Sequence, residues 1–231
     1  MFEPIDFVIE IMTIILIIIA LALGYRLLFK YGRIKDKNLL YMGICLILMT
    51  SIWWSTTISF LLILVTGSGL SFEIYYFTLI FPLPWALFFW LIVFIDLKNE
   101  SKKKMVVEIY LIFVVVFNVV FITLLFTIPS LLGTLNERGF SIRYGLVSVV
   151  FILIMLSILL ITAILFYLAT VDSNKRRIRI KGKFIFIGFL LFIIGVLLDT
   201  LPFIFDILAR IVEAFSVIFL YLGFNLPKRF N

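Results

Sequence analysis

The sequence contains no histidine and a single cysteine, Cys45, among its 231 residues. These two shortages exclude disulfide bonds within the chain and metal sites built from cysteine or histidine ligands. They also exclude catalytic arrangements that pair histidine with serine or cysteine. We therefore predict that the protein is not an enzyme and that it holds no cofactor or metal ion.

Charged residues are also scarce, at 14% of the chain, while hydrophobic residues make up 65%. A soluble domain has roughly 25% charged and about 45 to 50% apolar residues, so the composition predicts a polytopic membrane protein. The net charge of +7 could suggest nucleic acid in a soluble chain. Here the basic residues fall in linkers between apolar segments, so we expect contact with anionic lipids and no nucleic-acid partner.

Seven apolar segments are long enough to span a bilayer, which needs about 20 mainly apolar residues. The predicted spans are approximately 5–28, 39–65, 75–97, 106–128, 145–169, 184–201 and 205–224. The linkers between them leave no room for a soluble domain. We predict an all-α fold in which residues 1–231 form one seven-transmembrane helix bundle.

The distribution of lysine and arginine predicts the orientation of this bundle. Sixteen of these residues fall in the linkers after the first, third and fifth spans and in the tail, whereas the opposite side has only Arg138 and Arg143. Because basic residues favour the cytoplasmic side, we expect the N-terminus outside, the C-terminus inside, and a multi-pass location in the cell membrane.

The last two predicted spans contain an unusual group of charges between Asp199 and Glu213. Asp206, Arg210 and Glu213 are spaced i, i+4, i+7, so they share one face of the final helix. A charge near the bilayer centre costs about 2.5 to 3.5 kcal/mol on insertion scales. We predict that this face looks into the bundle and borders an outward-facing cavity. The alternative, that Asp206 and Arg210 extend to the lipid headgroups, remains open.

Other polar or aromatic residues in the outer half of the predicted bundle are Glu10, Trp53, Trp54 and Tyr76. The two tryptophans fall near the middle of the second span, whereas tryptophan usually marks the membrane interface. We predict that these four residues bind a ligand together with the charged group; helix packing is the alternative. Pro82 and Pro84 are expected to bend the third span, where Tyr76 lies at the outer end.

The outline of seven spans with an outer N-terminus is similar to that of microbial rhodopsins. The run from Asp206 to Arg210 also resembles that family's last-helix pattern of Asp, two residues, Ala and Lys. In the family this lysine forms the retinal Schiff base. Arg210 cannot do so because its guanidinium stays protonated, so no retinal is predicted.

These observations favour a receptor-like or sensor-like protein with an outward-facing cavity for a small-molecule or lipid ligand. Acidic residues exceed basic ones on the predicted outer side, which favours a cationic or zwitterionic ligand. A separate cytoplasmic partner would read the signal from the basic inner loops. Two alternatives are a transporter that uses Glu213 or Asp206 as a proton-coupled carboxylate, and a structural subunit of a membrane complex.

Overall fold

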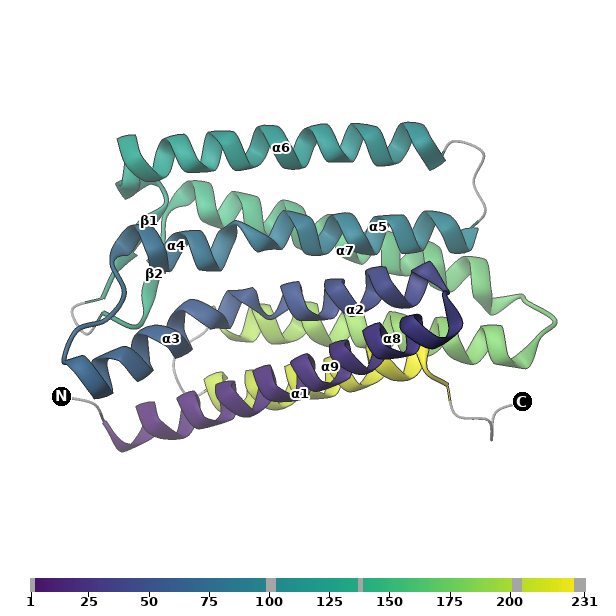
Figure 1. The fold of residues 1–231 in the computed structure, drawn as a ribbon, viewed down its shortest axis with the longest axis horizontal. Coiled ribbons are helices and arrows are strands. Elements are labelled where there is room, and N and C mark those ends of the chain that lie inside the picture. Colours follow the sequence, from purple (N-terminus) through teal and green to yellow (C-terminus); the bar gives the residue numbers. More distant parts are fainter. Residues whose placement is uncertain (1–2, 99–102, 137–138, 201–204, 227–231) are drawn as a thin grey trace.

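The computed structural model of the chain describes residues 3–98, 103–136, 139–200 and 205–226. Within these ranges it is a bundle of α-helices with one short antiparallel hairpin (Figure 1). The helices are α1 (Pro4–Ile34), α2 (Lys37–Met49), α3 (Ser51–Thr66), α4 (Phe72–Ile80), α5 (Pro82–Lys98), α6 (Lys103–Thr127), α7 (Leu146–Val171), α8 (Arg176–Leu198) and α9 (Asp206–Phe224). A short 3₁₀ helix η1 (Pro129–Leu131) leads into the strands β1 (Gly133–Leu135) and β2 (Ile142–Tyr144).

The prediction of a helical bundle with several segments able to span a membrane is confirmed, whereas the exact number of spans and their orientation stay predictions. In the described chain six helical segments are long and apolar enough to cross a bilayer, and the pair α2–α3 forms a seventh if it counts as one span. This correspondence follows from the sequence, because only a helix satisfies every backbone hydrogen bond within a single segment crossing hydrocarbon.

The second predicted span is not one straight helix. It breaks at Thr50 into α2 and α3, which meet at an angle of 46°. The Thr50 hydroxyl donates to the Ile47 carbonyl oxygen at 2.7 Å and accepts from Trp54 Nε1 at 3.0 Å. The side chains at the break therefore bond to the backbone and to each other, which explains a bend that contains no proline.

The bend expected at Pro82 and Pro84 is less marked. The chain leaves helical geometry only at Phe81, directly before Pro82, and α4 and α5 together pass as one span from Phe72 to Asp96. Proline fits the first turn of a helix because that turn needs no backbone donor. The two prolines therefore begin α5 without turning it sharply from α4.

The basic run from Arg176 to Lys183 forms the first turns of α8, not a linker as predicted. Long basic side chains can follow a helix out of the apolar region and keep their charged ends in water. The described ends of α1, α5, α7 and α9 next to the basic segments lie together at one end of the bundle (Figure 1). The start of α1 and the β1–β2 hairpin lie at the opposite end.

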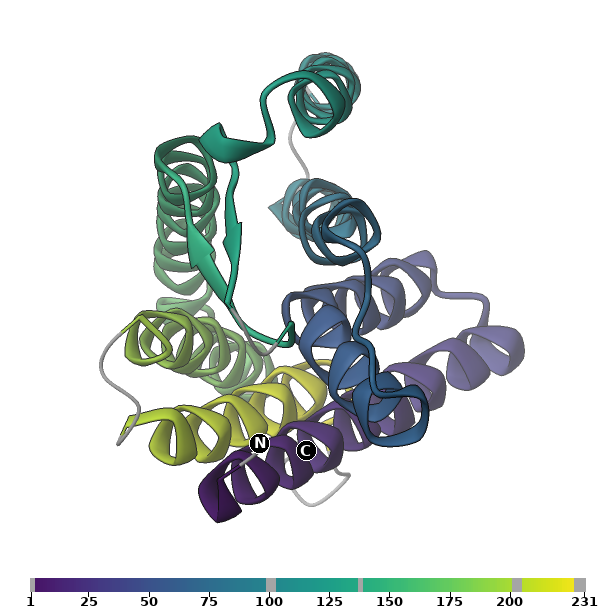
Figure 2. The same cartoon turned by 90° about the vertical axis from the view of Figure 1, so that its left-hand side faces the viewer.

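Figure 2 views the bundle from this hairpin end. The hairpin lies across the end of the bundle between α7 and the pair α3–α4, and α6 stands outermost against α5. The most extensive helix contacts are those of α8 with α9, followed equally by those of α2 with α1 and of α2 with α5. The α1–α2 contact is close because Gly24 and Gly43 present no side chains to each other's backbone. The hairpin itself was not predicted.

Candidate functional site

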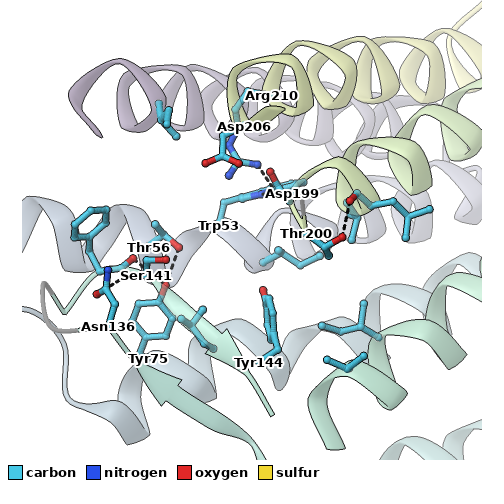
Figure 3. Close-up of a pocket in the computed structure, with 18 of the residues that line it drawn as sticks. Trp53, Thr56, Tyr75, Asn136, Ser141, Tyr144, Asp199, Thr200, Asp206 and Arg210 are labelled. Atoms are coloured by element: carbon cyan, nitrogen blue, oxygen red, sulfur yellow. Dashed lines mark hydrogen bonds and ion pairs between the residues drawn. The ribbon is translucent and has the colours of Figure 1, made fainter. Parts of the chain in front are cut away.

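A cavity of about 350 Å³ lies near the hairpin end of the bundle. Its walls come from α1, α3, α4, α7, α8, α9 and the hairpin, so segments far apart in the sequence share it. Figure 3 shows that most of the labelled side chains are polar or charged. This size lies at the lower end of the range for small-molecule sites.

Arg210 of α9 is the centre of the charged wall. Its Nη1 donates to Asp199 Oδ2 at 2.6 Å and to Glu213 Oε2 at 2.9 Å, and its Nε donates to Thr13 Oγ1 at 2.8 Å. These contacts join the end of α8, the second turn of α9 and the first half of α1. One guanidinium thus holds three helices together around two carboxylates.

Trp53 of α3 adds a fourth helix to this network. Its Nε1 donates to Asp199 Oδ2 at 3.0 Å, and the Arg210 guanidinium carbon lies 5.3 Å from its ring centroid. This distance is within the range for a cation–π interaction. The Trp53 ring also packs edge-on against Phe192, so both Arg210 and Phe192 contact it.

The prediction that the charged face of the last helix looks inward is confirmed for its two deepest members. Glu213 is completely buried and Arg210 is 9% exposed. In the described chain Arg210 forms ion pairs with Asp199 and Glu213 but none with Asp206. Asp206 borders the same cavity as Arg210, but the ion pairs of Arg210 are made by Asp199 at the end of α8 and by Glu213.

The carboxylates of this network are not fully satisfied. Asp199 Oδ1 and Glu213 Oε1 are buried without a hydrogen-bond partner among the residues that the structure describes. Gly195 of α8 permits the close position of Glu213, since a Cβ at residue 195 would overlap the Glu213 side chain. Within the described chain, the two buried carboxyl groups therefore share a single cationic partner, Arg210.

The opposite wall carries hydroxyl groups. Tyr75 Oη hydrogen bonds to Thr56 Oγ1 at 2.8 Å and donates to the Phe140 carbonyl oxygen at 3.1 Å. Tyr144 of β2 instead points its hydroxyl into the cavity (Figure 3), where it makes no hydrogen bond to any described residue. Burial, together with the nearby Asp199 carboxylate, raises the pKa of the Tyr144 phenol. This hydroxyl stays protonated and available to a ligand.

Hydrogen bonds to the helices hold the segment from η1 to β2 over the cavity. Tyr76 Oη and Ser148 Oγ both donate to the Leu132 carbonyl oxygen, at 2.9 and 2.8 Å. On the other side, Ser59 Oγ of α3 donates to the Gly139 carbonyl oxygen at 2.6 Å. The segment is thus fixed to α3, α4 and α7.

The seven predicted ligand-binding residues divide into two groups. Those lining the cavity are Glu10, Trp53, Asp206 and Arg210. The other three lie elsewhere: Glu213 is behind Arg210, Trp54 bonds to Thr50 at the α2–α3 bend, and Tyr76 anchors the segment before β1.

Sequence reasoning missed several lining residues, above all Asp199 and Tyr144. Asp199 was placed in the charged group of the last two predicted spans but not among the ligand-binding residues, because its role depends on how the end of α8 folds against Arg210. Tyr144 could have been found from the alternation Ile142, Arg143, Tyr144, which is typical of a strand with one buried face. Thr56 and Tyr75 come together only because α3 and α4 pack side by side.

The charge balance of the cavity is strongly acidic. Its charged lining residues are the acids Asp6, Glu10, Asp199 and Asp206 and a single base, Arg210. Thr57 Oγ1 donates to Glu10 Oε2 at a long 3.5 Å. No three acidic or thiol side chains of the described residues are grouped closely enough to hold a metal ion.

Comparisons with known proteins give no match. No protein family model fits the chain, and no curated protein or solved structure is significantly similar to it. The function is therefore inferred from the geometry and chemistry of the cavity.

Proposed function

We propose that this protein is a receptor-like or sensor-like membrane protein that binds a small, positively charged ligand in the cavity at the hairpin end. The observation that carries the proposal is the cavity wall itself, where four acids face one guanidinium. That guanidinium already pairs with Asp199 and with the buried Glu213.

The remaining acids give the cavity its preference for a cation. With Arg210 paired to Asp199 and Glu213, the carboxyl groups of Glu10 of α1 and Asp206 of α9 are left on the wall to supply negative charge to a bound cation. Such charge acts strongly at a site enclosed by apolar helices, where the effective dielectric constant is far below that of water. The aromatic rings of Trp53 and Tyr144 add surfaces against which an ammonium group can rest.

The location of the basic residues gives the proposed orientation. The described basic segments lie at the end opposite the hairpin (Figure 1). By the positive-inside rule that end faces the cytoplasm of a protein in the cell membrane, and the cavity is reached from outside.

Ligand binding would bias the packing among several helices at once. A cation held between Glu10 and Asp206 attracts α1 toward α9, and it competes with Arg210 for Asp199 at the end of α8. Because α8 continues to the basic turns that begin at Arg176, a shift of this helix changes the inner basic surface. A separate cytoplasmic partner or anionic lipid would respond to that change.

Thermal unfolding of the protein in lipid nanodiscs tests the proposal. Benzylammonium should raise the melting temperature, whereas benzyl alcohol, its uncharged analogue, should not. Ligand at a concentration a hundred times its dissociation constant should increase the free energy of unfolding by about 2.7 kcal/mol. Asp206→Asn should weaken benzylammonium binding by about tenfold, equivalent to ~1.4 kcal/mol. The matched control is Asp172→Asn, because Asp172 is exposed after α7 at the other end. Equal effects of the two compounds, or of the two variants, would contradict the proposal.

Proton-coupled transport is the second candidate, and Glu213 is the observation in its favour. Its carboxylate is completely buried directly behind the cavity wall, and Oε1 has no hydrogen-bond partner among the described residues. A carboxylate in this position can take up a proton when Arg210 turns toward Asp199. Cation uptake into proteoliposomes that follows a proton gradient and is lost in Glu213→Gln would favour transport over sensing.

The third prediction, a structural subunit of a membrane complex, remains a prediction. Arg210 finds its ionic partners within the chain, so the charged cluster does not require a second chain. Co-purification of another membrane protein, lost on Arg210→Ala, would favour this alternative.

A further inference from the structure

A second, apolar cavity of about 50 Å³ adjoins the polar one; we name it the apolar annex. Its walls include Cys45 of α2, Ala86 and Trp90 of α5, Met155 of α7 and Phe192 of α8. All five of these residues are buried in the core of the bundle.

The two cavities share part of their lining. Ile52, Ile152, Leu156 and Val196 border both of them. Val196 lies one helical turn before Asp199, on the same face of α8, and Ile52 directly precedes Trp53. The annex therefore adjoins the polar cavity beside the Asp199–Trp53 hydrogen bond, so one molecule can occupy both.

The annex is unsuitable for water. A buried water needs two to four polar partners, and the lining side chains offer only the Cys45 thiol, the Trp90 N–H and the weakly accepting sulfurs of Met49 and Met155. Trp90 Nε1 already donates to Thr162 Oγ1 at 2.8 Å, and a thiol is a weak partner. Hydrocarbon, in contrast, gains dispersion contacts and loses contact with water when it fills such a space.

We infer that the ligand is a cationic amphiphile, with an ammonium-type group at the acidic wall and a short hydrocarbon part in the apolar annex. This inference rests on the proposed function and adds the chemical class of the ligand. The charge supplies attraction and orientation, and the annex selects among cations by the size of their apolar part.

A homologous series of n-alkylammonium ions, from methylammonium to hexylammonium, tests the inference by calorimetric titration of the protein in nanodiscs, with empty nanodiscs as reference. Each methylene that enters the annex should increase the affinity about fourfold. The increase should extend over at least two successive members of the series and then stop when the annex is full.

Two variants of the annex distinguish this site from the surrounding lipid. Ala86→Leu places a larger side chain in the annex and should abolish the chain-length dependence while methylammonium still binds. Leu156→Ala enlarges the annex and should move the end of the increase to longer chains, which keeps the test decisive if Ala86→Leu does not fold.

The outcomes separate the inference from the proposed function. Binding of all members with equal affinity, or a chain-length dependence unchanged in both variants, would overturn the inference and leave cation binding intact. Failure of every member to bind would overturn the proposed function as well.

Discussion

At the scale of single residues, Arg210 connects the most elements of the cavity wall, since its guanidinium bonds to Thr13, Asp199 and Glu213. It is 9% exposed, and its guanidinium donates hydrogen bonds to two carboxylates and to the neutral hydroxyl of Thr13. Burying these charges costs free energy. Removing one member of the ion-paired network would leave an uncompensated charge in the interior. The residue therefore stabilises the bundle and at the same time shapes the cavity wall.

We predict that Arg210→Leu destabilises the protein by about 3 to 5 kcal/mol, because Asp199 and Glu213 then lose their shared cation. Thermal unfolding in detergent measures the change. Replacing Glu213 by leucine in the same variant should restore part of the loss. Arg26→Leu is the control, since Arg26 is exposed on α1 and should change stability by no more than about 0.5 kcal/mol. An Arg210→Leu protein as stable as wild type would contradict the prediction.

Two tyrosines of the cavity should respond differently to loss of their hydroxyl groups. Tyr75→Phe removes hydrogen bonds to Thr56 and to the Phe140 carbonyl and should cost about 1 to 2 kcal/mol of stability. Tyr144→Phe removes a hydroxyl that bonds to no described residue, so stability should change by less than about 0.5 kcal/mol while benzylammonium binds more weakly. The reverse order of stabilities would show that Tyr144 is structural.

At the scale of elements, the contact between α8 and α9 is the most extensive in the bundle and depends on glycine. Gly195 faces Glu213, and Gly188 faces Leu220, whose Cγ would lie 2.6 Å from an added Cβ. These glycines allow α9 to place its carboxylate and guanidinium next to the end of α8. The Arg210 network is therefore a consequence of helix packing as well as of charge.

Gly195→Ala should destabilise the protein by about 1 to 3 kcal/mol, because the new methyl group overlaps the Glu213 side chain and forces the two helices apart. Gly32→Ala is the matched control within a helix. Nothing lies within 4 Å of its added Cβ, so higher helix propensity should stabilise it by about 0.5 to 1 kcal/mol. Chemical unfolding in detergent compares the two, and equal changes would argue against the close contact.

Some features of these elements could be predicted from the sequence and others could not. The length of the apolar runs predicted the spans, because helices that cross hydrocarbon must be long and apolar. It did not predict the break at Thr50, which depends on a threonine hydroxyl and the Trp54 indole. The helical spacing of the charged residues predicted that Arg210 and Glu213 share an inward face. The ion pair between Arg210 and Asp199, in contrast, depends on how the end of α8 folds against α9. Tyr144 enters the cavity only through the hairpin.

At the scale of the whole molecule, the bundle has two chemically different ends. One end carries the described basic segments, and the other holds an acidic cavity beneath a hairpin. By the positive-inside rule we propose that the first end faces the cytoplasm and that the cavity is reached from outside. The polarity of the molecule thus makes cation binding from outside the central expectation.

Reaction of a cysteine in the cavity with charged thiol reagents tests this expectation most directly. Thr56→Cys, made in a Cys45→Ala background, places a thiol on the cavity wall. Ile58→Cys, on the exposed apolar face of the same helix, is the control that lipid should shield. Both variants are treated on intact cells with the membrane-impermeant reagents trimethylammonioethyl methanethiosulfonate, a cation, and sulfonatoethyl methanethiosulfonate, an anion. We predict that Thr56→Cys reacts from outside and reacts about tenfold faster with the cation, while Ile58→Cys stays unmodified. No reaction at Thr56→Cys from outside, or equal rates with the two reagents, would contradict an outward-facing cavity selective for cations.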